Sequence, residues 1–515
     1  MREFTGILRS ADMKGLRSSP LQVRNVPYLF QAHNVRIEEH GIRPFEPVID
    51  PFNDTLDVVF PFPQLFHGDK VTLLADEQQI QLVNDTWDTE VLVTVDPATL
   101  RPTAIQPGGV WHFVDLFDAW YLFNGSCVVF KTGFDNELQR PRNEAYVANL
   151  PTITTGCKHR GRIVTGGFDR QNFWNYMWTD IFDEWRDKFQ WMDWLDASAP
   201  DDNFVVWSSI GGGDFPLWLI YPFDSNNARL KPTAASVIER IKRNEFGWMP
   251  LENSGNILRV APLGKHFIAY GTQGIYALSA PAGRTDVADT YGKHMLKAIG
   301  ILDRGSVGVS KDRHIFIDAK LRLWSIDPEL RLQELDYREW MPDSETVITY
   351  DDNTDRFFLS DSDGAYLLDI GGLSSHNQAI TSTIEKDGIT YGLFEDLDID
   401  DNAMLVTTGF DLQVRGIKTI TSIVLGLVGG GTISVAVDYR YTDDDKTWSR
   451  TAWHPVNREG IAHPRIAGTD FRVVVRASDY TTFELDYIQV KWQSSDKRSL
   501  RGPGPTSLYG SQNAL

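Results

Sequence analysis

Short hydrophobic runs alternate with polar turns over most of the chain, whereas patterns with the period of an α-helix are scarce. Between residues 55 and 400, β-rich runs broken by Gly, Asp and Asn recur at intervals. Four segments show an apolar strand, a polar turn, a second strand, a tight turn and a third apolar strand. These segments are residues 111–131, 257–279, 306–326 and 346–370. The pattern predicts a mainly β protein built from successive meanders.

The tight turns of these meanders contain Asn124-Gly125, Gln273-Gly274 and Asp363-Gly364. Each pair offers a residue that tolerates positive φ where a short hairpin requires one. A single meander cannot bury both of its faces, so several in series must stack face to face or arrange themselves radially. The weaker runs at residues 71–84 and 203–221 indicate an irregular β-propeller with an open blade count.

One segment, residues 172–195, breaks the β pattern. Its apolar residues recur at spacings of three and four, which predicts an amphipathic helix inserted into the sheet region. The apolar face either covers the end of the propeller or docks against a neighbouring subunit. Trp174, Trp178 and Trp185 on this face are therefore candidate residues of a subunit interface.

Changes in pattern divide the chain into four parts. Residues 1–50 form an amino-terminal arm and edge segment, and residues 51–401 form the propeller-like domain. Residues 402–493 form a β-sandwich, because several of their strands alternate apolar and polar positions. Residues 494–515, rich in Gly, Pro and Ser, cannot bury enough surface to fold alone, so we expect a flexible or partner-ordered tail.

The amino-terminal arm carries mild positive charge in an acidic protein. Residues 1–45 hold seven Arg or Lys and four acids, a net charge of +3, against −20 for the whole chain. Such an arm either reaches across an acidic neighbour or lies on its own propeller. The overall negative charge argues against a nucleic-acid clamp, because phosphate binding depends on Lys and Arg.

The length and composition indicate a globular protein of several packed units. The chain has 515 residues, of which 42% are apolar and 23% charged. A chain this long exceeds the size at which one hydrophobic core keeps growing. Its 16 Trp, 17 Tyr and 28 Phe favour large buried areas in cores and subunit interfaces.

The two cysteines, Cys127 and Cys157, are too few for a disulfide framework or a zinc site. We expect buried thiols and production in the cytoplasm. The first 16 residues lack the apolar core of a signal peptide, and no stretch is long and apolar enough to span a bilayer.

Catalytic and ligand-binding motifs are missing from the sequence. It contains no G-x-S-x-G elbow, H-E-x-x-H, P-loop or Rossmann pattern, and its 11 His are dispersed. Gly211, Gly212 and Gly213 lie between Trp207 and Trp218 without a following helix start, and so form a loop. We therefore expect a non-enzymatic protein with no catalytic residue, no cofactor and no metal.

Two acidic clusters lie at predicted turns. Residues 351–355 and 361–364 offer oxygen ligands for calcium, but neither completes a loop with a bidentate Glu, so both are interpreted as hairpin turns. Residues 441–448 (YTDDDKTW) resemble the Asp-box turn of sialidase-type propellers, except that Asp445 stands where that motif has Gly. In that family the box is a structural turn, in which Asp443 would cap the hairpin above Trp448.

Two stretches resemble the propeller core of a viral protein family. They are residues 159–168 (HRGRIVTGGF) and 205–221 (VVWSSIGGGDFPLWLIY). The order of parts agrees as well: residues 15–20 (GLRSSP), then 34–36 (NVR), then meanders, and near the end 486–490 (DYIQV). The chain thus resembles the β-propeller type of tail nozzle protein in short-tailed bacteriophages.

The resemblance implies a structural virion protein made in the host cytoplasm. Six identical subunits would form a ring beneath the portal and adaptor ring proteins, beside the tail fibre or spike proteins, as conduit and gate for DNA ejection. Carboxylates on the channel wall would repel DNA phosphates, and Gly211–Gly213 or Gly429–Gly431 would supply loops in the lumen. Two alternatives stay open: a glycan-binding or glycan-cleaving propeller of a receptor-binding tail component, and a cellular propeller scaffold.

Overall fold

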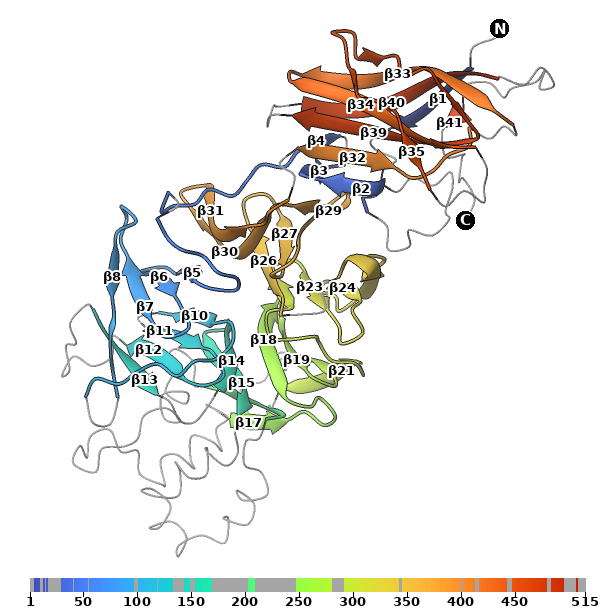
Figure 1. Cartoon of the computed structure of the whole chain (residues 1–515). Coiled ribbons are helices and arrows are strands. Elements are labelled where there is room, and N and C mark those ends of the chain that lie inside the picture. Colours follow the sequence, from blue (N-terminus) through green and yellow to red (C-terminus); the bar gives the residue numbers. More distant parts are fainter. Residues whose placement is uncertain are drawn as a thin grey trace, which may run out of the picture.

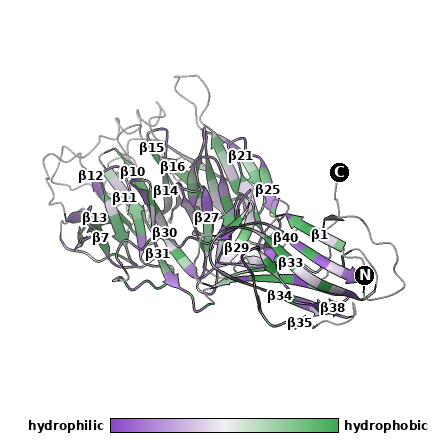
Figure 2. Cartoon of the chain, turned by 90° about the horizontal axis from the view of Figure 1, so that it is seen from above, coloured by the Kyte–Doolittle hydropathy of each residue, from purple (hydrophilic) through white to green (hydrophobic). Residues whose placement is uncertain are grey.

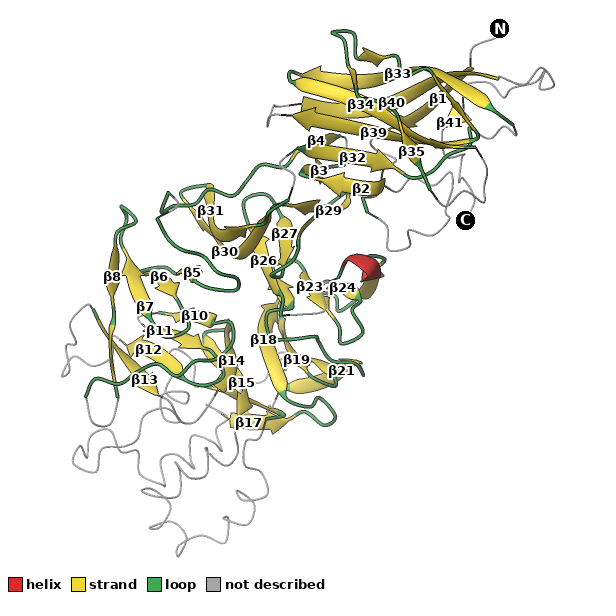
Figure 3. Ribbon diagram, viewed as in Figure 1, coloured by secondary structure: helices red, strands yellow, loops and turns green. Residues whose placement is uncertain are grey.

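The structure is a computed structural model of the whole chain. It describes residues 4–9, 13, 15–16, 29–39, 41–53, 55–96, 101–117, 119–132, 143–148, 153–168, 202–208, 247–279, 291–341, 345–399, 402–412, 416–441, 447–478, 483–494 and 506–507. Within these residues nearly all elements are β-strands, and a 3-10 helix spans Arg338–Trp340 (Figure 3). The predicted mainly β class is confirmed. No helix in the described part of the chain is long and apolar enough to cross a membrane.

Six consecutive antiparallel meanders, here called blades 1 to 6, form the larger part of the molecule (Figure 1). Blade 1 consists of β5 (Gln64–His67), β6 (Thr72–Ala75), β7 (Ile80–Val83) and β8 (Thr89–Val91). Blade 2 consists of β10 (His112–Leu116), β11 (Ala119–Phe123), β12 (Val128–Thr132) and β13 (Glu144–Ala148), with β9 (Val93–Val95) parallel to β13. Blade 3 consists of β14 (Ile153–His159), β15 (Arg162–Phe168), β16 (Phe204–Trp207) and β17 (Gly247–Pro250).

The next three blades repeat this order. Blade 4 consists of β18 (Ile257–Leu263), β19 (His266–Gly271), β20 (Ile275–Ser279) and β21 (Gly292–Lys297). Blade 5 consists of β22 (Val307–Val309), β23 (His314–Ile317), β24 (Leu323–Ile326) and β25 (Leu332–Leu335). Blade 6 consists of β26 (Val347–Asp351), β27 (Arg356–Ser360), β28 (Ala365–Asp369) and β29 (Gly372–His376). Each of the four meanders predicted from the sequence contributes its three strands to one blade.

Neighbouring blades pack face to face and form a propeller-like arrangement. One buried cluster joins blades 1 and 2, another joins blades 3 and 4, and a third joins blades 4 and 5. The second strand of each blade is enclosed on both faces, so β11, β19 and β27 are buried at every residue. Such strands carry continuous apolar runs because neither face meets water.

A two-stranded hairpin, β30 (Gln378–Lys386) and β31 (Ile389–Asp396), fills the space between the last blade and the first. Ile384 and Leu393 of this hairpin share a core with Leu65 of blade 1. On its other side, Ile380 packs with Phe358 of blade 6. The hairpin thus occupies a seventh position, and the series of packed sheets returns to its start.

The two ends of the chain together build a second body beside the blades. One sheet contains β1 (Phe4–Arg9), β3 (Val35–Ile37), β4 (Ile42–Pro44), β33 (Lys418–Gly429), β37 (Ile461–Ala462), β38 (Ile466–Gly468), β40 (Phe483–Ser494) and β41 (Thr506–Ser507). The other contains β2 (Leu29–His33), β32 (Ala403–Thr407), β34 (Thr432–Arg440), β35 (Ser449–Arg450), β36 (His454–Pro455) and β39 (Asp470–Ser478). Most of their buried residues belong to one hydrophobic cluster, which also includes residues of blades 5 and 6, while Val406, Ala436 and Val474 form a separate small cluster. Figure 2 shows hydrophobic and hydrophilic residues alternating along the long strands of this body.

The described strands of the amino-terminal segment belong to the two terminal sheets. β1 pairs antiparallel with β40 along its whole length, and Leu8 opposite Ile488 is 1% exposed. The strands β1 to β4 lie in the sheets formed by the carboxy-terminal strands, whereas Phe45 and Val48 pack against blade 6 and the hairpin. The predicted helix at residues 172–195 lies outside the described residues. So does most of the tail, of which Thr506 and Ser507 pair with β1.

Hydrogen bonds between side chains and the backbone stabilise two of the predicted turns. Gly125 adopts a φ of +85°, as expected, and Asn124 Oδ1 accepts hydrogen bonds from the Ser126 and Cys127 amides at 2.9 and 2.8 Å. The turn at Gly364 needs no positive φ, because Asp361 Oδ1 accepts from the Gly364 amide at 2.6 Å. Asp and Asn side chains that bond to the backbone two or three residues later hold such turns without glycine geometry.

Candidate functional site

The structure describes only some of the candidate residues that the sequence suggested. Trp174, Trp178 and Trp185, and Gly211, Gly212 and Gly213, lie outside the described residues. The residues from Gly429 to Gly431 form the exposed turn between β33 and β34. Gly429 and Gly431 adopt φ values of +106° and +144° there, so this turn uses backbone conformations that favour glycine.

The acidic turns hold their carboxylates in local hydrogen bonds. Asp351 Oδ1 accepts from the Asn353 amide at 3.1 Å, and Asp361 Oδ1 accepts from the Asp363 amide at 2.8 Å. Within the described residues, no group of three or more His, Cys, Asp or Glu side chains is arranged to hold a metal ion. The turn at residues 442–446, which would complete the Asp-box likeness, lies outside the described part.

Both cysteines are buried free thiols, as the sequence predicted. Cys127 lies in the core between blades 1 and 2, and Cys157 lies in the core between blades 3 and 4. Burial raises the pKa of each thiol to about 12. A thiol with such a pKa is a weak nucleophile at neutral pH, which fits a packing role.

The first strands of the blades lie at the centre of the propeller-like body. β10 contacts β14, β14 contacts β18, β18 contacts β22, and the series continues through β26 and β30 to β5. A cavity of about 400 Å³ lies among these strands, lined by residues of β5, β10, β18, β26 and β30. It is therefore surrounded by four blades and the hairpin, here called the central cavity.

Arg259 of β18 and His112 of β10 line the central cavity from two different blades. Arg259 Nε is buried and has no hydrogen-bond partner, and the same holds for Nδ1 of His112. Burial lowers the pKa of Arg259 to about 10. Burial is the largest cause that lowers the pKa of His112 well below its usual range. The positive charges of Arg259 and Arg304 lower this pKa further.

The second candidate region is the junction between blade 6 and the terminal body. The outer strand β29 pairs with β2 through His33 and Ser375, so blade 6 and one terminal sheet form a single ten-stranded sheet. The Asn34 amide donates to the Ser375 carbonyl at 2.8 Å. The ring of Phe45 stacks on that of His376 with centroids 4.6 Å apart. The junction is thus both hydrogen-bonded and packed.

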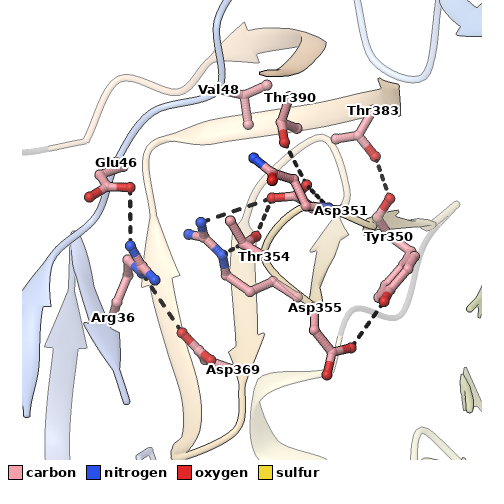
Figure 4. Close-up of polar contacts among 12 residues, drawn as sticks. Arg36, Glu46, Val48, Tyr350, Asp351, Thr354, Asp355, Asp369, Thr383 and Thr390 are labelled. Atoms are coloured by element: carbon pink, nitrogen blue, oxygen red, sulfur yellow. Dashed lines mark hydrogen bonds and ion pairs between the residues drawn. The ribbon is translucent and has the colours of Figure 1, made fainter. Parts of the chain in front are cut away.

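Charged groups reinforce this junction (Figure 4). Arg36 of β3 lies 3.1 Å from Glu46 and 3.8 Å from Asp369 at the end of β28. On the neighbouring β26–β27 turn, Thr390 of the hairpin donates to Asp351 Oδ1 at 2.6 Å. These contacts join the amino-terminal segment, blade 6 and the hairpin into one connected unit.

Sequence reasoning missed Arg259, His112 and the junction. A signal for Arg259 was present, because it is the one charged residue in the otherwise apolar strand ILRVAPL of residues 257–263. His112 gave no comparable signal, since polar residues are common at the start of a strand. The junction residues are separated by more than 300 positions, as in the pair His33 and Ser375.

Comparisons with known proteins leave the family open. No family model matches the chain, and no curated protein matches it. Among solved structures, PorZ, a surface component of the type-IX secretion system of Porphyromonas gingivalis, is 8% identical with a TM-score of 0.34. The match covers 82% of this chain and 45% of PorZ, so this chain spans less than half of that protein.

Two further structures show a similarly distant likeness. Virginiamycin B lyase from Staphylococcus aureus is 8% identical, with a TM-score of 0.36 over 66% of this chain and 94% of that one. The Pan2 WD40 domain of Neurospora crassa is 6% identical, with a TM-score of 0.31 over 64% of this chain and 85% of that one. Because these likenesses are so remote, the fold is defined by the sheet order and packing of the chain itself.

Proposed function

We propose that the chain is a non-enzymatic virion protein that forms a ring, the nozzle, at the end of a short bacteriophage tail. The observation that supports this proposal is the position of the residues that carry the family resemblance. Gly15 and the segment 34–36 contact blade 6 at the junction, and residues 487–490 pair with β1. Gly15 and the segment 34–36 thus connect the terminal body with blade 6, residues 487–490 lie within one terminal sheet, and residues 159–168 lie in β14 and β15 of blade 3.

The architecture proposed for this role is an irregular β-propeller followed by a β-sandwich. Six blades and the hairpin would form the propeller, and the two terminal sheets would form the sandwich. Within the sandwich, the strand β1 pairs with β40 and with β41.

The proposed mechanism is electrostatic. Copies of the chain, each with a net charge of −20, would surround a channel whose carboxylates repel DNA phosphates. A duplex would then meet no strong binding site and would slide through. The turn from Gly429 to Gly431, which is exposed, and the segment from Gly211 to Gly213 are the proposed lumen loops.

Negative-stain imaging of the full chain, alone and mixed with portal and adaptor proteins, tests the proposal. We expect rings of six subunits around a central hole, and tails that end in such a ring. A chain that stays monomeric in the presence of both partner rings would overturn the proposal. A glycan array run in parallel covers the alternative, because selective glycan binding would favour a receptor-binding component.

A further inference from the structure

We propose that Arg259 and His112 form a binding site for a phosphate group, free or carried by a small phosphate ester, inside the central cavity. This inference does not depend on the nozzle proposal, since it concerns the centre of one subunit. It rests on three observations: an uncompensated guanidinium, an unpartnered imidazole nitrogen and a cavity between them.

The guanidinium of Arg259 has no counter-charge among the described residues. No ion pair or hydrogen bond joins it to another side chain, and its buried Nε lacks an acceptor. The groups that act on its charge are Cys157 and Tyr270, neither of which is a carboxylate. The side chain of Arg259 is only partly exposed and its Nε is shielded from water, so an anion placed against it gains both attraction and hydrogen bonds.

His112 supplies a complementary atom. Its side chain is 3% exposed, and the backbone carbonyl of Arg304 accepts a hydrogen bond from the ring. Nδ1 then remains as an unpartnered nitrogen. In the neutral ring this nitrogen accepts a hydrogen bond. A hydrogen-phosphate group meets both requirements, because its hydroxyl donates to His112 while its charged oxygens accept from Arg259.

The carboxylates that line the cavity come from strands and turns other than the strand that carries Arg259. Asp351 accepts local hydrogen bonds and forms an ion pair with Arg356, 3.9 Å away. Asp352 is paired with Lys311 at 3.3 Å, and Glu385 is exposed. All three acids lie on the β26 and β30 side, whereas Arg259 lies on β18. A volume of about 400 Å³ holds a phosphate group with part of a small ester.

Isothermal titration of the full chain with inorganic phosphate tests the site. We expect saturable binding to the wild type, weakened about ten-fold to a hundred-fold in Arg259→Gln because charge-assisted hydrogen bonds are lost. His112→Phe should weaken binding less, and Arg259→Lys should retain part of it. Arg450→Gln is the matched control, because that arginine is paired with Asp438 at 2.6 Å, away from the cavity. Far-UV circular dichroism checks that each variant is folded.

Two results would overturn the site. One is the absence of saturable phosphate binding to the folded wild type, and the other is equal binding by wild type and Arg259→Gln. Glycerol phosphate distinguishes a free phosphate from a phosphate ester, because tighter binding of the ester would identify the ester as the preferred ligand. Ring assembly is measured separately by imaging, so failure of one proposal leaves the other intact.

Discussion

The Nδ1 atom of His33 lies 3.0 Å from the Oγ atom of Ser375, although the two residues are 342 positions apart in the sequence. The Ser375 hydroxyl donates to the Ala32 carbonyl at 3.1 Å and so accepts from His33. This pair fastens β2 to β29, where a blade of the propeller-like body continues into the terminal sheet. The two bodies are therefore joined by shared sheet and not by a linker alone.

Substitution of Gly15 by alanine should loosen this junction. Gly15 has a φ of +69°, and an added Cβ would lie 2.6 Å from the Leu373 amide nitrogen. We expect Gly15→Ala to lower the free energy of unfolding by about 2 kcal/mol, because both strain and steric overlap arise. Urea denaturation measures the effect. In the control Gly430→Ala, the new Cβ meets nothing within 4 Å, so a comparable loss in both variants would contradict this account.

Acid should weaken the junction through His376. Burial lowers the pKa of His376 from 6.5 to about 3, so the folded chain holds this ring neutral while the unfolded chain protonates it. Its contribution to stability is present above pH 6.5 and is lost as the pH falls towards 3. Between pH 6.5 and 5 the loss amounts to roughly 2 kcal/mol.

The variant His376→Gln should flatten the dependence of stability on pH in this window. Thermal unfolding of wild type and variant at several pH values between 7 and 4 gives the comparison. His463→Gln serves as control, because His463 is exposed. An unchanged slope in His376→Gln would show that other groups carry the acid sensitivity.

Among the carboxylates of blades 4 and 5, we expect that of Asp318 to contribute most to the stability of the fold. It is fully buried, accepts hydrogen bonds from Arg322 and Trp324, and lies 3.5 Å from Lys297 of the neighbouring blade. Asp318→Asn leaves these cations without their partner and should cost about 3 kcal/mol. Asp327 is the matched control, because it accepts from the Arg331 amide in a similar turn but is partly exposed. Asp327→Asn should cost less than about 1 kcal/mol.

The effect of Asp318→Asn should shrink in acid. Burial alone would raise the pKa of Asp318, but hydrogen bonds from Lys320, Arg322 and Trp324 outweigh burial and lower that pKa below 3.8. The stability supplied by the carboxylate is therefore present above pH 3.8 and is lost as the pH falls through the lowered pKa. Urea midpoints at pH 7 and pH 3 check this, and a constant difference between wild type and variant would speak against it.

Cys127 and Cys157 should resist modification in the folded protein. Burial raises the pKa of both thiols to about 12, so little thiolate exists at pH 8. We expect slow reaction with a thiol reagent under native conditions and rapid reaction of both thiols in urea. Mass spectrometry after timed labelling measures the two rates. Rapid labelling of either thiol in the native state would place that cysteine nearer to solvent than the structure does.

The sequence by itself determined the strands and their grouping into meanders. Residues 257–279, for example, contain three runs that became β18, β19 and β20, because apolar runs and turn residues act locally. The tertiary structure alone decided that residues 4–9 pair with β40 and that blade 6 extends into a terminal sheet. Pairing between distant strands depends on the shared core that they bury, which leaves no local pattern. The same reason applies to Arg259, whose charge is visible in the sequence but whose lack of a partner depends on side chains from several blades.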